Sequence, residues 1–251
     1  MARARADHLL VLRGLTDTQA RAQALIMAGL VYAGERKIAK PGDLLPADTA
    51  LVLRRPAHPF VSRGGLKLDH ALNHFALSPD GLTCLDIGAS TGGFTDVLLQ
   101  RGAKFVHAID VGHGQLAWKL RTDPRVKVHE RTNARHLTAD LIGQPIHAVV
   151  CDASFIRLAS VLPAALSLCA EGGFAVALIK PQFEASRDQI GENGVVRDPE
   201  LHQQICADIR AWWHNLGGWS VLGITQSPIT DPEGNIEFLI AAKRLLADNR
   251  A

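Results

Sequence analysis

The sequence lacks the features that mark disulfide-stapled, exported or membrane-spanning chains. Its four cysteines form no C-x-x-C pair and show no metal-ligand spacing with the histidines. Three of them lie in or beside apolar runs, which indicates buried free thiols and a reducing, cytoplasmic location. The basic amino terminus has no apolar core adequate for a signal peptide. The most apolar region, 159–179, is interrupted by Pro163 and by the acidic and glycine residues at 171–173, which favours a helix and a buried strand over a membrane span.

The net charge is also close to zero, but the basic and acidic residues are unevenly distributed along the chain. The chain of 251 residues carries a net charge of +2, and its 47% hydrophobic and 21% charged residues indicate a folded globular protein. Residues 1–67 hold 11 Lys and Arg against 5 Asp and Glu, or +6, and the remainder holds 16 against 20, or −4. A basic amino-terminal part on an acidic protein favours a module that binds a polyanion, although chance clustering on a solvated surface gives the same count.

Residues 5–60 are predicted to form a small unit of two short helices and a small sheet, too small to bury a large core and therefore typical of a binding module. The patterns R-x-D-x-L-L-V-x-R-G-L at 5–15 and A-R-A-x-x-L-I-x-x-G-L-V-Y at 20–32 resemble the RNA-binding domain of a small-subunit ribosomal protein, with Ala6 where leucine is usual. The basic residues expected to contact RNA are Arg5, Arg13, Arg21, Arg36, Lys37 and Arg63.

The stretch TCLDIGASTGGFT at 83–95 predicts a strand, a glycine-rich turn and a helix, with Thr91 or Thr95 as the helix cap. Its glycine spacing differs from the dinucleotide fingerprint G-x-G-x-x-G, and Asp86 suits a cationic or hydroxyl-rich ligand better than a phosphate. S-adenosylmethionine fits both departures, and an ordinary strand–turn–helix connection fits equally well. The cofactor-binding residues predicted here are Asp86, Gly88, Ala89, Ser90, Thr91, Gly92, Gly93 and Phe94.

The rest of the chain alternates predicted strands and helices, which favours a parallel α/β sheet covered on both faces. The last two strands, 219–226 and 236–243, have no helix between them and predict an antiparallel hairpin at the sheet edge. That hairpin distinguishes a class I methyltransferase, a Rossmann-like fold with a mostly parallel seven-stranded sheet, from a standard dinucleotide-binding fold. The predicted domains are a small α+β RNA-binding domain at 1–55, a linker at 56–63 and the methyltransferase domain at 64–251.

Several polar residues follow these strands at the edge where such sheets bind ligands. Asp110 with Val111 is placed to accept hydrogen bonds from a ribose, which we favour over a helix cap, and Asn133 either reaches an adenine or is an ordinary loop residue. Asp152 and Lys180 each end a very apolar strand, where an unpaired charge would cost several kcal/mol. By pattern alone, Lys67 and Glu237 would be surface residues.

The order of SRGGLKL, LDIGASTGGFTDVLL, DASFI, IKPQFE, GVVRDP and SPITDPEGNIEFL after an RNA-binding module resembles the TlyA family. These bacterial proteins, historically called hemolysins, are FtsJ-type rRNA 2'-O-methyltransferases. The resemblance covers nearly the whole chain and implies a Lys-Asp-Lys-Glu catalytic tetrad at Lys67, Asp152, Lys180 and Glu237, with Asp152 also at the cofactor. Departures lie at 192–193, where a basic glycine-rich loop is common, and at Asp231, where glycine is frequent.

The resemblance therefore implies S-adenosylmethionine-dependent methylation of a cytidine 2'-hydroxyl in 16S or 23S rRNA, or both, without a metal. A ribose hydroxyl is a poor nucleophile, so Lys180 is the candidate proton acceptor, and Asp152 and Glu237 are expected to orient the two lysines. Phe155 could stack on the target base, although packing in the core is the favoured interpretation. The alternatives are a non-catalytic RNA-binding protein and a membrane-active hemolysin, for which the sequence offers neither an apolar span nor an export signal.

Overall fold

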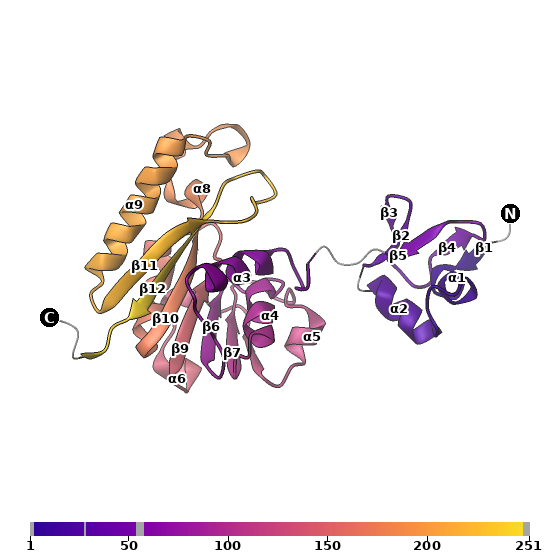
Figure 1. Ribbon diagram of the computed structural model, residues 1–251, viewed down its shortest axis with the longest axis horizontal. Coiled ribbons are helices and arrows are strands. Elements are labelled where there is room, and N and C mark those ends of the chain that lie inside the picture. Colours follow the sequence, from indigo (N-terminus) through magenta and orange to yellow (C-terminus); the bar gives the residue numbers. More distant parts are fainter. Residues whose placement is uncertain (1–2, 28, 54–57, 248–251) are drawn as a thin grey trace. The chain divides into compact units, whose positions relative to one another are not determined.

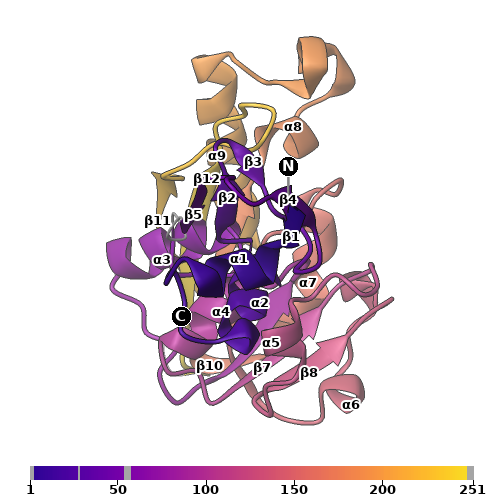
Figure 2. The same ribbon diagram turned by 90° about the vertical axis from the view of Figure 1, so that its right-hand side faces the viewer.

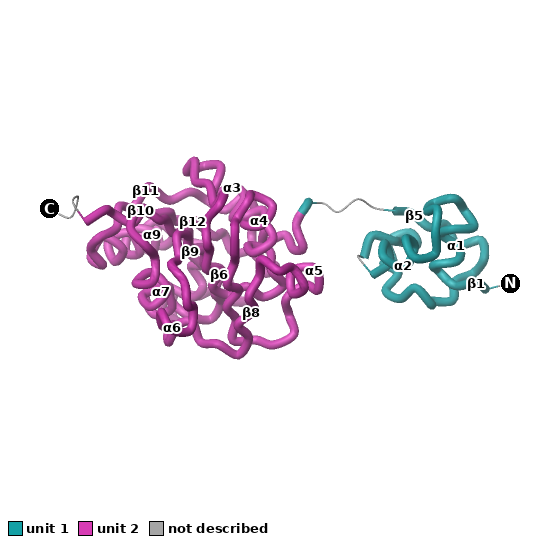
Figure 3. Tube along the Cα trace, turned by 90° about the horizontal axis from the view of Figure 1, so that it is seen from below, with its two compact units in different colours: residues 1–59 teal, residues 60–251 magenta. Residues whose placement is uncertain are grey.

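The computed structural model divides the chain into two units, residues 1–59 and residues 60–251 (Figure 3). It describes residues 3–27, 29–53 and 58–247, so part of the predicted linker at 56–63 lies outside the described residues. Residues 60–63 pack on the larger unit: the backbone N–H of Val61 donates to the Asp96 carboxylate at 2.7 Å, and Phe60 lies against Gly65. These residues therefore act as the first packed segment of the larger unit.

The smaller unit contains the two short helices and the small sheet that its sequence predicts. Its three-stranded sheet has the order β3-β2-β5, and β1 pairs with β4 in a separate antiparallel ladder that the sequence did not reveal. A core of small and branched apolar side chains, including Leu9, Leu10 and Ile26, holds the unit together. Its elements are β1 (Arg3–Arg5), α1 (Ala6–Leu12), α2 (Gln19–Met27), β2 (Val31–Ala33), β3 (Arg36–Lys37), β4 (Leu44–Pro46) and β5 (Leu51–Leu53).

The larger unit is built on one seven-stranded sheet of order β11-β12-β10-β9-β6-β7-β8 (Figure 1). Strands β8, β7, β6, β9 and β10 run parallel, and β12 is antiparallel to both of its neighbours, as the terminal hairpin predicts. The strands are β6 (Thr83–Ile87), β7 (Phe105–Ile109), β8 (Val126–His129), β9 (Ile146–Cys151), β10 (Cys169–Ile179), β11 (Trp219–Gln226) and β12 (Phe238–Arg244).

Helices cover both faces of this sheet, as Figure 2 shows after a quarter turn. Alternation along the strands explains why: in β9, Ala148 and Val150 join the core beneath α3 and α4, and Val149 and Cys151 join the core beneath α7 and α9. The helices are α3 (Gly64–His74), α4 (Gly93–Gln100), α5 (Trp118–Arg121), α6 (Ala139–Ile142), α7 (Leu158–Ser167), α8 (Pro181–Glu184) and α9 (Pro199–Asn215), with short turns η1 (Ala134–His136), η2 (Arg187–Gln189) and η3 (Glu192–Gly194).

This topology positions the site. Strand β6 lies between β7 and β9, so the connections that leave β6 and β9 run in opposite directions and leave a crevice above their carboxyl ends. None of the described helices is long and apolar enough to cross a membrane.

Candidate functional site

The turn after β6 depends on glycine because the neighbouring backbone lies very close. Gly88 has φ +79°, and a Cβ on it would lie 2.9 Å from the carbonyl oxygen of Asp152. The N–H groups of Gly88 and Ala89 donate to the carbonyl of Ile109 at 2.9 and 3.1 Å, which joins the turn to the end of β7. The turn therefore passes directly over the ends of both neighbouring strands.

The start of α4 differs from the prediction that Thr91 or Thr95 caps it. Gly92 is the N-cap, with φ +98° and no side-chain cap, and a Cβ there would lie 2.3 Å from Leu120. The Thr95 hydroxyl instead donates to the Asp86 carboxylate at 2.6 Å. Close packing of α5 on the turn leaves room only for glycine, and the buried carboxylate takes the threonine that local sequence would assign to the cap.

Asp86 is completely buried behind the turn and does not line either of the two cavities described below. Burial raises the pKa of its carboxyl to about 7, in spite of the hydrogen bond from Thr95, and the charge of Asp152 adds to the rise. Its Oδ1 atom has no hydrogen-bond partner. The structure therefore separates Asp86 from the cavities, as it does Gly92, while the other predicted cofactor residues line them. The hydrogen bond from Thr95 gives Asp86 the role of joining β6 to α4.

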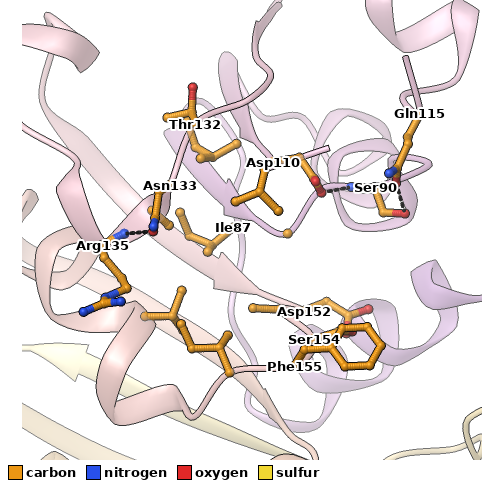
Figure 4. A pocket seen from close by; sticks show the side chains of 17 residues that line it. Ile87, Ser90, Asp110, Gln115, Thr132, Asn133, Arg135, Asp152, Ser154 and Phe155 are labelled. Atoms are coloured by element: carbon orange, nitrogen blue, oxygen red, sulfur yellow. Dashed lines mark hydrogen bonds between the residues drawn. The ribbon is translucent and has the colours of Figure 1, made fainter. Parts of the chain in front are cut away.

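A cavity of about 490 Å³ lies above the ends of β6, β7 and β9 (Figure 4). Apolar side chains of Ile87, Ile109 and Val161 form part of its wall. Asp110 stands at its edge and accepts hydrogen bonds from the backbone N–H groups of Ser90 at 2.8 Å and Gly112 at 2.7 Å. These two bonds fix the carboxylate while leaving it beside the cavity, which suits recognition of hydroxyl groups.

The predicted residues Val111 and Asn133 line the same cavity. Val111 is 71% exposed, and Asn133 caps η1 by accepting from the backbone N–H of Arg135 at 3.0 Å. The cap orients the amide of Asn133 at the cavity edge. Asn133 is thus both a loop residue that caps η1 and a residue that lines the cavity, so the two alternatives are compatible.

A second cavity, of about 170 Å³, adjoins the first at the glycine turn. Gly88, Ser90, Asp152 and Ser154 line both cavities, so the two form one continuous site. The second cavity also includes residues that start α3 and α4 and the end of β10; they are Ser62, Gly64, Ala89, Thr91, Gly93, Phe94 and Lys180.

Four ionisable side chains form two ion pairs in this part of the fold. Lys180 Nζ lies 2.6 Å from Asp152 Oδ1, joining the ends of β10 and β9. Lys67 Nζ contacts Glu237 Oε2, joining α3 to the residue before β12. Lys67 and Lys180 are each only 8% exposed and Glu237 only 1%, although the pattern of the sequence would place Lys67 and Glu237 on the surface.

The two pairs share one electrostatic environment. Burial raises the pKa of Glu237, the charges of Lys67 and Lys180 lower it, and the charge of Asp152 raises it again. Glu237 therefore interacts with the other three groups. Strands β10 and β12 are neighbours, which explains how residues from four separate segments meet.

Phe155 contradicts the favoured interpretation that it belongs to the core. Its side chain is 90% exposed, it has φ +63°, and it stands at the edge of the larger cavity. Its ring centroid lies 5.0 Å from that of Phe183, in the turn after Lys180. A bulky residue at positive φ has a strained backbone, which persists only where the surrounding structure holds it. We therefore attribute the outward position of the ring to its surroundings.

The predicted RNA-binding residues of the smaller unit have different environments. Arg5 forms an ion pair with the buried Asp7 at 2.7 Å, and Arg13 donates to the backbone carbonyls of Ala47 and Thr49. The side chains of these two arginines are thus already engaged in holding the unit together. All six predicted contacts are exposed, and Arg63 belongs to the larger unit.

Sequence reasoning missed two parts of the site. Ser154 accepts a hydrogen bond from Lys180 at 2.8 Å, and Ser62 lines the second cavity just before α3. Their only signals were proximity to Asp152 and to the SRGGLKL motif. Serine in a loop is too common for either signal to be specific.

Comparisons with known proteins agree with this geometry. Residues 60–244 match the model of the FtsJ-like methyltransferase family. The chain is 47% identical over 239 residues to the 16S/23S rRNA (cytidine-2'-O)-methyltransferase TlyA of Mycobacterium tuberculosis, covering 95% of this chain and 89% of that protein.

Two solved structures extend the comparison. A protein of Streptococcus thermophilus described as a hemolysin superposes with a TM-score of 0.74 at 44% identity, covering 98% of this chain and 90% of that one. A protein of Listeria monocytogenes described as an S-adenosylmethionine-dependent methyltransferase superposes with a TM-score of 0.54 at 14% identity, covering 74% of this chain and 100% of that one. This second likeness concerns the fold alone.

Proposed function

The chain belongs to the FtsJ-like methyltransferase family, and we propose that it transfers a methyl group from S-adenosylmethionine to a ribose 2'-hydroxyl of ribosomal RNA in the cytosol. A cytidine is the expected target, because the related protein of M. tuberculosis is named for that nucleotide. The observation that carries the proposal is the position of the Lys180–Asp152 pair at the junction of the two cavities.

The larger cavity fits the cofactor. Its volume of about 490 Å³ lies in the range of small-molecule sites, and its apolar wall beside a carboxylate suits a purine next to a ribose. Asp110 would accept hydrogen bonds from the ribose hydroxyls, Asn133 would contact the adenine, and Gly88 would allow close approach to the backbone. The glycine turn from Ala89 to Phe94 would surround the remaining part of the cofactor.

When bound, S-adenosylmethionine supplies a sulfonium methyl group: the ribose oxygen would form a bond to the methyl carbon with its own electron pair, and the electron pair of the breaking C–S bond would stay on sulfur. The residues of the chain provide position and a proton acceptor. An uncharged Lys180 amine would take the proton of the 2'-hydroxyl and become an ammonium beside Asp152. Lys67 and Glu237 line neither cavity, and Glu237, held by Lys67, would act on Lys180 and Asp152 through its charge. Most of the acceleration would come from alignment of the reacting groups in the second cavity.

RNA recognition would combine the two units. The exposed basic side chains of Arg21, Arg36 and Lys37 would contact RNA phosphates. At the site, the exposed ring of Phe155 would stack on the target base once that base leaves its helix. Exposure of an aromatic ring at the edge of the larger cavity supports this role over packing in the core.

The experiment that tests the proposal is transfer of labelled methyl from S-adenosylmethionine to separated ribosomal subunits. We expect the label in nuclease-resistant dinucleotides, because 2'-O-methylation blocks hydrolysis of the adjacent phosphodiester bond. Lys180→Ala should abolish transfer. Lys104→Ala is the matched control, because this exposed lysine precedes β7 at the opposite end of the sheet.

Each result discriminates between mechanisms. Label on a base would contradict ribose methylation while leaving the cofactor assignment in place. Full activity of Lys180→Ala would remove Lys180 as the proton acceptor. Cofactor binding without transfer to any ribosomal RNA would point to a different RNA, and absence of cofactor binding would favour a non-catalytic RNA-binding protein.

A further inference from the structure

Ser154 lies at the centre of the site without a role in the reaction described above. It follows β9 by three residues, lines both cavities, and accepts a hydrogen bond from Lys180 Nζ at 2.8 Å. The same nitrogen lies 2.6 Å from Asp152 Oδ1. Asp152 is therefore the ion-pair partner of Lys180, but its Oδ1 atom accepts no hydrogen bond, and the hydrogen bond that holds the amino group goes to Ser154.

We infer that Ser154 is a positioning residue that sets the rotation of the Lys180 amino group, an inference that rests on the proposed methyl transfer. An uncharged amine carries two N–H groups and one lone pair at the corners of a tetrahedron. With one N–H donated to Ser154 and the other turned towards the Asp152 carboxylate, its ion-pair partner, the lone pair would occupy the remaining corner. The proton of the 2'-hydroxyl passes to this lone pair, and the resulting ammonium later releases a proton to solvent.

Loss of the Ser154 hydroxyl would remove the hydrogen bond that holds the Lys180 amino group and leave it beside Asp152 with the ion-pair contact alone. The amino group could then rotate about its bond to Cε, and the lone pair would be directed at the substrate for only part of the time. Proton transfer in the reacting complex requires this alignment, because the donor and acceptor must lie within hydrogen-bond distance as the methyl moves. Binding of either substrate does not require it.

The segment that carries Ser154 is held in place by α8, the short helix that follows Lys180. Glu184, at the end of α8, accepts the backbone N–H of Leu158 at 2.8 Å and so caps α7, whose own N-cap residue Arg157 provides no side-chain bond. The rings of Phe155 and Phe183 lie 5.0 Å apart between these two ends. The position of Ser154 relative to Lys180 is thus fixed from both sides.

The backbone next to Ser154 supports the same conclusion. Phe155 has φ +63°, a conformation that a side chain of this size adopts only when its surroundings impose it. This strain is confined to the residue between Ser154 and the α7 cap. Strain at such a place is typical of functional segments that need one defined geometry.

The test compares Ser154→Ala with Ser154→Thr, which keeps a hydroxyl at the same carbon. We expect Ser154→Ala to lower kcat by roughly 10- to 100-fold, the loss that follows from imperfect alignment at a reacting group. The KM values for cofactor and RNA, the cofactor Kd from calorimetry, and the melting temperature should stay close to those of the unaltered protein. Ser154→Thr should recover most of kcat.

Ser90→Ala provides the contrast, because Ser90 lines both cavities but bonds to Gln115 at 3.1 Å instead of Lys180. We expect this variant to change the KM and Kd of the cofactor more than kcat. The inference is wrong if Ser154→Ala keeps normal kcat, if Ser154→Thr is as impaired as Ser154→Ala, or if the loss lies in cofactor binding. Failure of the unaltered protein to methylate any rRNA would overturn the proposed function itself.

Discussion

Lys67 and Glu237 stand 170 positions apart in the chain and form an ion pair in which Lys67 is 8% and Glu237 1% exposed. The pair joins α3 to the segment that enters β12, across the face of the sheet that carries Lys180. Two charges so deeply buried are stable only together, because each would otherwise lose its hydration without compensation.

A double-variant cycle tests this dependence. Lys67→Met and Glu237→Gln should each cost about 3–5 kcal/mol in the free energy of unfolding, because each leaves the other charge unpaired in the interior. The double variant should cost clearly less than the sum, and methyl transfer should be lost in all three proteins. Urea unfolding measures the free energies; additive losses would show that the two side chains do not stabilise each other.

Replacing Phe155 by glycine should keep or raise the stability of the fold but weaken the binding of rRNA. Phe155→Gly removes a strained positive φ and should keep or slightly raise stability, by up to about 1 kcal/mol. It should raise the KM for rRNA by roughly 5- to 150-fold, the equivalent of about 1–3 kcal/mol for stacking on one base. Phe155→Trp, which keeps a ring, is the control. An unchanged KM for rRNA in Phe155→Gly would remove the ring from RNA recognition.

Asp86 predicts a loss of stability as the pH rises. Its pKa is raised from 3.8 to about 7, so between these values the folded state binds a proton that the unfolded state has released. Stability contributed by the neutral carboxyl is complete below pH 3.8 and is lost as the pH rises through 7. Asp86→Asn has no such carboxyl, so its stability relative to the unaltered protein should increase by about 3 kcal/mol between pH 5 and pH 8. Equal differences at the two pH values, measured by urea unfolding, would contradict a raised pKa.

The histidine pair of β7 and β8 predicts a loss of stability in the acid direction. His107 is buried, its Nδ1 lies 3.0 Å from His129 Nε2, and burial with the charges of His129 and Lys127 lowers its pKa from 6.5 to about 4. The unfolded state takes up a proton below pH 6.5 while the folded state does not. Stability is therefore unaffected above pH 6.5 and falls by up to about 3 kcal/mol as the pH drops towards 4.

His107→Gln tests the histidine prediction by comparing urea unfolding at pH 7 and pH 5. The variant is expected to be less stable at pH 7 but to lose less stability than the unaltered protein on acidification. Because Asp86 acts in the opposite direction over the same pH window, the comparison must be made between the two proteins at each pH. A parallel loss in both would show that His107 does not carry the effect.

Local patterns in the chain were sufficient to predict the sheet, the glycine turn and the terminal hairpin. Each of these depends on neighbouring residues: alternating apolar runs form buried strands, and glycines allow the turn after β6. The positions of Asp110, Asp152 and Lys180 followed, since polar residues after parallel strands meet at one edge of the sheet.

The tertiary structure decided which of the remaining residues are buried and which partners they have. Lys67 and Glu237 have the local pattern of surface residues, but the packing of α3 on the sheet buries Lys67, and the pairing of β10 with β12 places Glu237 in the interior. Phe155 has the local pattern of a core residue, but the α7 cap and the end of β9 turn its ring outward. Burial and ion pairing depend on segments that lie far away in sequence, and no local periodicity encodes those contacts.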